Sequence, residues 1–258
     1  MEFYYTLMFF ILGITLGSFY NVVGYRLPKG ESLVYPPSHC PKCNRRLTPI
    51  ELIPVLSFII QKGKCKGCSS KISLFYPFFE FMTGFLFALV YLIFGFSLDL
   101  VIVLIFISMS LIIIISDYKY FIISDEVLVV SVILFVITLY FKIGKVQLLY
   151  SLIDGVIAFT VMFLNKKLGD FLFKKESMGG GDIKLLFVFG LVLGWEMAIL
   201  SIFIASFLGL PVSFILSKKN DENIIPFVPF LVIAALIIIF LKIDINTIIN
   251  LYNLFIIR

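Results

Sequence analysis

The chain has little charge. Only 14% of its 258 residues are charged and 61% are hydrophobic, whereas soluble proteins carry about 25% charged residues. The sequence holds one His, one Trp and four Cys, and it lacks the glycine fingerprint of a dinucleotide-binding fold. The scarcity of charge excludes an ordinary soluble domain and indicates a membrane protein.

Long apolar segments are abundant. Several reach the roughly 20 residues that are needed to cross about 30 Å of hydrocarbon. We therefore expect an all-α polytopic membrane protein with about eight transmembrane helices. The expected spans lie near residues 4–25, 76–95, 98–116, 126–142, 147–165, 183–196, 198–216 and 225–243, the sixth being the shortest.

Both ends of the chain are also apolar. No small-residue cleavage site follows the first span, so we expect this segment to remain as a membrane helix and not to be a signal peptide. The last stretch, Ile245 to Ile257, is too short to cross and is expected to lie in the interface.

The basic residues predict the orientation. Most of the 21 Lys and Arg residues fall in four segments, residues 26–71, 117–126, 166–184 and 218–219. The positive-inside rule places these segments in the cytoplasm, and an even number of spans then places both termini outside. Because loop bias accounts for the net charge of +5, no nucleic-acid partner is needed.

All four cysteines lie in one loop between the first two spans, as Cys40-Pro-Lys-Cys43 and Cys65-Lys-Gly-Cys68. Two such pairs can supply four thiolates to a tetrahedral zinc ion. The alternative is a pair of disulfides, but thiols stay reduced in the cytoplasm. Four thiolates leave no open coordination position, so the predicted zinc is structural. His39 is expected to be a surface residue.

Two aspartates are candidates for catalysis. Asp182 ends the run Met178-Gly179-Gly180-Gly181-Asp182, and Asp117 follows the third span. A carboxylate at the edge of hydrocarbon is costly to place and indicates a functional site. Two of them suggest an acid/base pair, with Gly179 and Gly181 letting a peptide approach. The alternatives are a helix cap for Asp182 and a boundary residue paired with Lys119 for Asp117.

Three further charged residues are candidates for supporting roles. Asp125 is either a second partner for Asp182 or the cap of the fourth span, and the residues alone do not rank it below Asp117. Lys184 either neutralises Asp182 or anchors in lipid headgroups. Glu80 either pairs with a basic residue of the cysteine loop or contributes to a substrate or cofactor pocket.

Glycines in the first span predict close packing. Gly13 and Gly17 have the small-xxx-small spacing that lets membrane helices approach one another.

Three classes of function fit these features. The first is an aspartic protease built into the membrane. The second is a non-enzymatic scaffold that docks partners through its zinc ribbon, and the third is an ion or proton pathway along acidic residues. A protease needs two carboxylates near one face, whereas a pathway needs polar residues at successive depths.

Four blocks of residues carry a resemblance to a known family. They are Gly17-Ser18-Phe19-Tyr20-Asn21-Val22 with Arg26-Leu27-Pro28, the two Cys-x-x-Cys pairs with Tyr76-Pro77-Phe78-Phe79-Glu80, the segment Asp117 to Asp125, and Gly179-Gly180-Gly181-Asp182-Ile183-Lys184-Leu185. In this order they resemble the bacterial type IV prepilin peptidases, which are bifunctional leader peptidases and N-methyltransferases with a Gly-x-Gly-Asp signature.

The resemblance implies the roles of several residues. It makes Asp117 and Asp182 the catalytic dyad, with Gly180 in the variable position of the signature. Asp125 matches a further aspartate of the family that usually follows proline, but here it follows Ser124.

The resemblance also implies domains, ligands and location. The domains are a first helix (1–25), a cytoplasmic zinc-binding loop (26–75) and a transmembrane protease core (76–258). The implied substrates are prepilins or pseudopilins, and the implied methyl donor is S-adenosylmethionine. The implied location is the bacterial cytoplasmic membrane, with the active site facing the cytoplasm.

Overall fold

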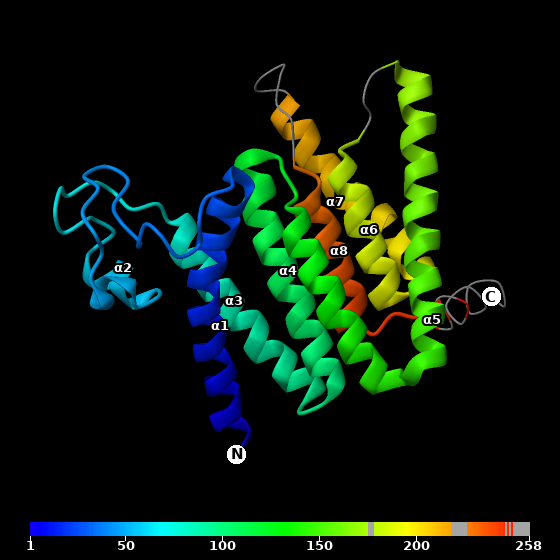
Figure 1. Cartoon of the computed structure of the whole chain (residues 1–258), viewed down its shortest axis with the longest axis horizontal. Coiled ribbons are helices and arrows are strands. Elements are labelled where there is room, and N and C mark those ends of the chain that lie inside the picture. Colours follow the sequence, from blue (N-terminus) through cyan, green and yellow to red (C-terminus); the bar gives the residue numbers. More distant parts are fainter. Residues whose placement is uncertain (175–177, 218–225, 246, 248, 250–258) are drawn as a thin grey trace. The chain divides into compact units, whose positions relative to one another are not determined.

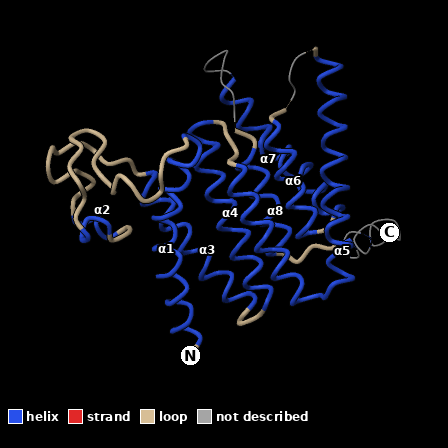
Figure 2. Tube along the Cα trace, viewed as in Figure 1, coloured by secondary structure: helices blue, strands red, loops and turns tan. Residues whose placement is uncertain are grey.

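The structure is a computed structural model that describes residues 1–174, 178–217, 226–245, 247 and 249. Within these residues the regular elements are helical (Figure 2), and two isolated β-bridges are the only pairing of extended backbone. The chain forms two compact units, Met1–Ser124 and Asp125–Arg258. The elements are α1 (Glu2–Arg26), η1 (Leu27–Lys29), η2 (Pro49–Leu52), α2 (Leu56–Ile60), α3 (Phe75–Phe94), α4 (Leu98–Tyr120), α5 (Asp125–Phe173), α6 (Gly180–Leu193), α7 (Trp195–Ser217) and α8 (Val228–Phe240). Figure 1 labels the α-helices.

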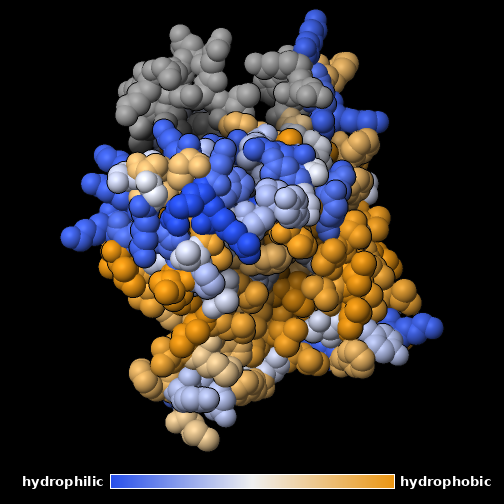
Figure 3. Space-filling view, turned by 60° about the vertical axis from the view of Figure 1, so that its left-hand side comes forward, coloured by the Kyte–Doolittle hydropathy of each residue, from blue (hydrophilic) through white to orange (hydrophobic). Residues whose placement is uncertain are grey.

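The structure confirms an all-α polytopic membrane protein. In the described part of the chain, five helices are long and apolar enough to cross a membrane: α1 with η1, α3, α4, α5 and α7. Their exposed side chains include many large apolar residues, which form a broad area beside a hydrophilic one in Figure 3. Such a surface is stable in lipid and not in water.

The number of spans remains a prediction. Helix α5 contains one break, at Gly144 (φ 75°, ψ 175°), between the segments predicted as the fourth and fifth spans. Helix α6 has 14 residues, so at 1.5 Å per residue it is only about 21 Å long. It is therefore shorter than the roughly 30 Å of a hydrocarbon core. The predicted interfacial stretch, Ile245 to Ile257, falls largely outside the described residues.

Helix α4 runs one turn further than the predicted span. It begins after Ser97, whose hydroxyl accepts the N–H of Leu100 (3.2 Å). It continues to Tyr120 because neither Gly nor Pro interrupts the sequence after residue 116. The end is a left-handed residue, Phe121 (φ 55°), whose N–H donates to the carbonyl of Asp117 (2.9 Å). Asp117 therefore lies in the last turn of the helix and not beyond it.

In the first unit, α1 packs along α3, and α4 contacts both. The predicted close approach occurs at Gly13, where a Cβ atom would lie only 2.7 Å from the Cα atom of Gly84. At Gly17 a Cβ atom would lie 2.7 Å from the hydroxyl of Thr83. The small residues of α1 thus bring two backbones into direct contact, as in other membrane helix pairs.

Gly13→Leu should separate α1 from α3. A side chain at position 13 has no space against the backbone of Gly84, and overpacking of this kind costs about 1–3 kcal/mol. We expect a clear fall in the thermal unfolding temperature of the purified protein in detergent. Ile11→Leu is the control, since Ile11 lies on the exposed side of the same helix. Equal stability of both variants would show that the contact does not matter.

Small residues also allow close helix packing in the second unit. The second arm of α5 packs on α6, and a Cβ atom at Gly190 would lie 2.6 Å from the carbonyl oxygen of Asp154 and 2.9 Å from the Cα atom of Gly155. Helices α7 and α8 pack on each other. This packing fixes α6, and with it the glycine run at its start.

Candidate functional site

The cysteine loop contains two matching turns. In the first, the N–H of Cys40 donates to the carbonyl of Arg45 (3.0 Å), and the N–H of Asn44 donates to the carbonyl of Cys40 (2.8 Å). In the second, Cys65 pairs with Ser70 and Ser69 with Cys65 in the same way, both at 2.9 Å. Asn44 and Ser69 both adopt left-handed backbone conformations (φ 53° and 56°). The repeated turn places the two thiols of each pair on one side.

The four thiols converge on one point. All four cysteines are free, and the Sγ atoms of Cys40, Cys43, Cys65 and Cys68 lie within 4.8 Å of one another. The Sγ atoms of Cys40 and Cys68 are 3.8 Å apart, and those of Cys43 and Cys65 are 4.0 Å apart. Four thiolates around zinc, each at about 2.3 Å, are separated by roughly 3.8 Å. The group can therefore hold a tetrahedral metal ion such as zinc.

Backbone donors favour the thiolate forms of Cys40 and Cys65, whereas burial and the neighbouring thiols raise the pKa of Cys43 to about 11. The N–H groups of Cys43 and Lys42 lower the pKa of the Cys40 thiol to about 6. The N–H groups of Cys68 and Gly67 lower the pKa of Cys65, and the Gly67 nitrogen lies 3.4 Å from its sulfur. Because the thiolate is the metal ligand, these donors prepare the site for a cation.

An ion pair supports the thiol cluster. The guanidinium of Arg45 donates to both carboxylate oxygens of Glu51 (2.6 and 3.2 Å) and also hydrogen-bonds to Cys65. Glu51 is buried and further accepts the N–H and hydroxyl of Thr48, both at 2.9 Å. Arg45, and after it the N–H of Thr48, lower the pKa of Glu51 to about 2. Arg45 thus links the first turn, Glu51 and a thiol of the second turn.

Glu51→Ala should loosen the metal site. It would leave the Arg45 guanidinium without its carboxylate beside the thiol cluster, and losing such an outer partner lowers metal affinity by about 10- to 100-fold. Competition with a chromophoric chelator measures this change. Lys66→Met, an exposed change inside the second turn, should retain the normal affinity. Equal affinities of the two variants would contradict the supporting role of Glu51.

Glu80 joins the cysteine loop to the membrane helices. Its carboxylate, on the first turns of α3, accepts the N–H of Val55 (2.7 Å) and hydrogen-bonds to Ser18 of α1. Val55 has φ 61°, a strained value for a β-branched residue, in a tight turn where the Leu56 N–H donates to the Pro54 carbonyl (2.6 Å). The loop partner of Glu80 is therefore a backbone group and not the basic side chain predicted as one alternative.

Asp117 is buried on the inner side of α4, with 7% of its surface exposed. Ile113 and Ile115, earlier in the same helix, are fully buried, as is the polar Ser116 directly before it. A carboxylate buried in this way is largely desolvated.

Asp182 stands at the start of α6. Gly179 caps the helix in an extended conformation, and Gly180, Gly181 and Asp182 form its first turn. Asp182 is half-buried, and its Oδ2 atom lies 3.6 Å from where a Cβ atom of Gly179 would be, at the helix start, where the dipole favours a negative charge. A Cβ atom at Gly180 would meet no atom of the described residues within 4 Å. Among the described residues, the side of Gly180 is thus open.

Lys184 binds Asp125. Its ammonium donates to both carboxylate oxygens, at 2.7 and 2.8 Å, and both side chains are half exposed or more. The pair borders a mainly apolar cavity of about 620 Å³ between the two arms of α5 and α6. Sequence reasoning paired Lys184 with Asp182 or with lipid, so this ion pair is new. It ties the start of α5 to the start of α6.

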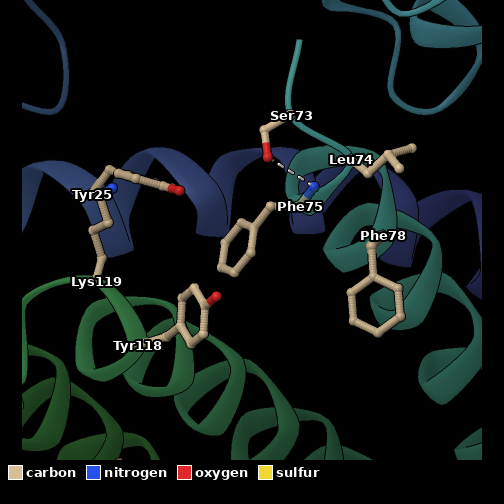
Figure 4. A pocket seen from close by; sticks show the side chains of 7 residues that line it. All are labelled: Tyr25, Ser73, Leu74, Phe75, Phe78, Tyr118 and Lys119. Carbon is tan, nitrogen blue, oxygen red and sulfur yellow. Dashed lines mark hydrogen bonds between the residues drawn. The ribbon is translucent and has the colours of Figure 1, made fainter. Parts of the chain in front are cut away.

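The structure also reveals an aromatic pocket that sequence reasoning missed. It lies in the first unit, where α1 and α4 end and α3 begins, and Tyr25, Phe75 and Tyr118 line it with Lys119 (Figure 4). The only sequence signal was the density of aromatic residues at these helix ends.

Comparison with known proteins assigns the class. Residues 11–94 match the sequence model of the Bacterial Peptidase A24 N-terminal domain, and residues 104–214 match that of the Type IV leader peptidase family. Three relatives are named prepilin leader peptidase/N-methyltransferase. The protein of Bacillus subtilis is 36% identical over 78% of each chain. That of Pseudomonas putida is 30% identical over 90% of this chain and 89% of its own, and that of Pseudomonas aeruginosa is 31% identical over 87% and 86%. No solved structure matches the chain.

The helices, the four-thiol insert and these matches define a multi-pass membrane enzyme of the aspartic protease class. The chain belongs to the type IV leader peptidase family. Of the three classes of function that fit the sequence, the protease is therefore favoured over the scaffold and the ion pathway.

Proposed function

We propose that this enzyme removes the basic leader of type IV prepilins or pseudopilins and then methylates the new N-terminal amine with S-adenosylmethionine. The observation that carries the proposal is the position of Asp117 and Asp182. Each lies at an end of a helix, one in the last turn of α4 and the other in the first turn of α6. Both fall within residues 104–214, which match the leader peptidase family.

In the proposed reaction the two aspartates have complementary roles. One carboxylate takes a proton from the attacking water. The other, protonated, donates a hydrogen bond to the scissile carbonyl and then a proton to the leaving amine. The open side of Gly180 leaves room for an extended peptide beside Asp182. Gly179 and Gly181 support this approach because glycine adds no side chain to the run.

The ion pair of Lys184 with Asp125 has a supporting role in this scheme. Because Asp125 binds the Lys184 ammonium, Lys184 does not neutralise Asp182, two residues before it in the sequence. Glu80 supports the other half of the enzyme by holding the cysteine loop on α1 and α3.

The metal in this proposal is one structural zinc ion. The four thiolates fill its coordination shell, so it stabilises the loop and takes no part in hydrolysis. The methyl donor supplies an electrophilic methyl group. We place the enzyme in the bacterial cytoplasmic membrane, with the zinc loop and both aspartates on the cytoplasmic side, as the basic residues predict.

Reporter fusions test this topology. Fusions after Lys71, Lys175 and Lys219 should report a cytoplasmic location, whereas fusions after Gly95 and Gly144 should report an external one. Lys175 and Lys219 lie outside the described residues. A cytoplasmic signal at Gly144 would contradict the eight-span arrangement and place the two aspartates on opposite sides of the bilayer.

A cleavage assay tests the function. The purified protein in detergent should convert a prepilin into a shorter product that is visible on a gel. A matched prepilin, in which the glycine before the cleavage point is replaced by a bulky residue, should remain intact. Cleavage of neither substrate, by protein that is folded and loaded with zinc, would overturn the proposal.

A further inference from the structure

The aromatic pocket of the first unit has the features of a ligand site. Its volume is about 390 Å³, within the range of roughly 300–1,000 Å³ that is typical of small-molecule sites. Its walls come from three helices: Tyr25 from the end of α1, Phe75 and Phe78 from the start of α3, and Tyr118 and Lys119 from the end of α4 (Figure 4). The N–H of Phe75 donates to the hydroxyl of Ser73 (3.2 Å), which fixes the first turn of α3.

The rings of this pocket are ordered by contacts with one another. Phe75 and Tyr118 stack with centroids 5.3 Å apart and an interplanar angle of 23°. Tyr25 stacks on Tyr76 (5.5 Å, 28°) and meets the edge of Phe75 (6.1 Å, 82°). Aromatic residues of a membrane-interface belt face lipid individually. Here rings from three helices line one open pocket, and Tyr118 is still 59% exposed, so ring surface remains for a ligand.

The charge of the pocket indicates which class of ligand it would bind. Lys119 extends from α4 toward Tyr25 (Figure 4) and is exposed. An ammonium at the rim attracts an anionic group, while ring faces attract planar bases and cations. A suitable ligand therefore combines an aromatic base, a positive centre and a carboxylate.

We propose that this pocket binds S-adenosylmethionine, an inference that rests on the methyltransferase half of the proposed function. The rings of Tyr25, Phe75 and Tyr118 offer π surface to the adenine and the sulfonium. Lys119 offers a cation to the methionine carboxylate. In the transfer itself the amine nitrogen forms a bond to the methyl carbon while the carbon–sulfur bond breaks. The electron pair stays on sulfur, S-adenosylhomocysteine leaves, and the methylated ammonium releases a proton to water.

The position of the pocket suits this order of reactions. Tyr118 and Lys119 directly follow Asp117 on the last turn of α4. One of the two proposed catalytic carboxylates thus lies on the same helix turn as two residues of the pocket wall.

Direct binding measurements test the inference. The full-length protein in detergent is titrated with tritium-labelled S-adenosylmethionine and, separately, with S-adenosylhomocysteine. Tyr118→Leu removes a ring face and should weaken S-adenosylmethionine binding at least tenfold, with a smaller loss for the uncharged thioether. Tyr118→Phe keeps the ring and should change binding less than threefold. Lys119→Gln should weaken both ligands to a similar extent, because both carry the carboxylate.

The control is Tyr4→Leu, the same change in an exposed tyrosine near the start of α1. It should leave both affinities unchanged. Thermal unfolding checks that each variant is folded, and the exposed position of Lys119 keeps the test valid if Tyr118→Leu does not fold. Normal donor binding by Lys119→Gln and by a folded Tyr118→Leu would overturn the inference, as would an equal loss in Tyr4→Leu.

The experiments distinguish a wrong assignment of the pocket from a wrong proposed function. If the unaltered protein binds the donor and methylates a cleaved pilin while the pocket variants bind normally, the pocket assignment is wrong and the function stands. If the unaltered protein neither binds the donor nor methylates any cleaved N-terminus, both fail together.

Discussion

Asp117→Asn and Asp182→Asn are each expected to lower the rate of prepilin cleavage at least about a thousandfold, because general acid–base catalysis contributes up to about 10⁴-fold. Asn preserves the shape of the side chain but cannot exchange the proton. The loss should therefore occur in folded protein with an unchanged thermal unfolding temperature. Single-turnover cleavage of a purified prepilin measures the effect without interference from product release.

Asp125→Asn is the matched control. It is the same chemical change, but Asp125 is largely exposed and engaged by Lys184. Exposed ion pairs contribute only about 0–1 kcal/mol, so we expect less than a tenfold loss of cleavage. An inactive Asp125→Asn together with an active Asp117→Asn would show that the dyad has been assigned to the wrong aspartate.

Removing the thiolates should have the second large effect. The purified protein should contain about one zinc ion per chain, and replacing Cys40 and Cys43 together with Ser should abolish its retention. In residues 30–74 only Cys40, Glu51 and Cys65 are buried, so the loop has almost no apolar core. Structural zinc supplies about 10–16 kcal/mol of apparent binding energy to small domains. We therefore expect the loop of the double variant to become sensitive to protease.

The unfolded loop should affect methylation more than cleavage. Ser73 and Leu74 connect the loop to Phe75, and all three line the aromatic pocket, whereas Asp117 is held by α4. Lys42→Ser, which lies between the first two cysteines and leaves both thiolates in place, should retain zinc and both activities. Freshly prepared, reduced protein without zinc would defeat the metal assignment. A loop as resistant to protease as the unaltered one would show that zinc does not hold it together.

The local features of this chain were readable from sequence because each depends on residues close together in the chain. The spacing of Cys40, Cys43, Cys65 and Cys68 predicted the cluster of four thiols, which the geometry bears out. Gly13 and Gly17 predicted a close approach of helices, although the sequence could not name Gly84 as the partner. The apolar runs predicted a polytopic membrane protein, although α4 extends one turn beyond its predicted end.

The features that were missed depend on distant residues. The bond between Lys184 and Asp125 joins positions 59 residues apart and requires α5 and α6 to start side by side. The aromatic pocket takes its rings from three helices, and nothing in the local pattern of Tyr25 or Tyr118 separates a pocket wall from an interfacial anchor. The carboxylate of Glu80 finds a backbone donor at Val55 because a strained turn points that N–H at it.

The most direct test of the proposed function is the intact mass of a prepilin after incubation with the purified protein, zinc and S-adenosylmethionine. We expect the mass to fall by that of the leader and the remaining chain to gain about 14 Da, because a methyl group replaces one amine hydrogen. Neither change should occur when the protein carries Asp182→Asn. A prepilin that keeps its full mass with the unaltered, zinc-loaded protein, or is cleaved equally by Asp182→Asn, would contradict it.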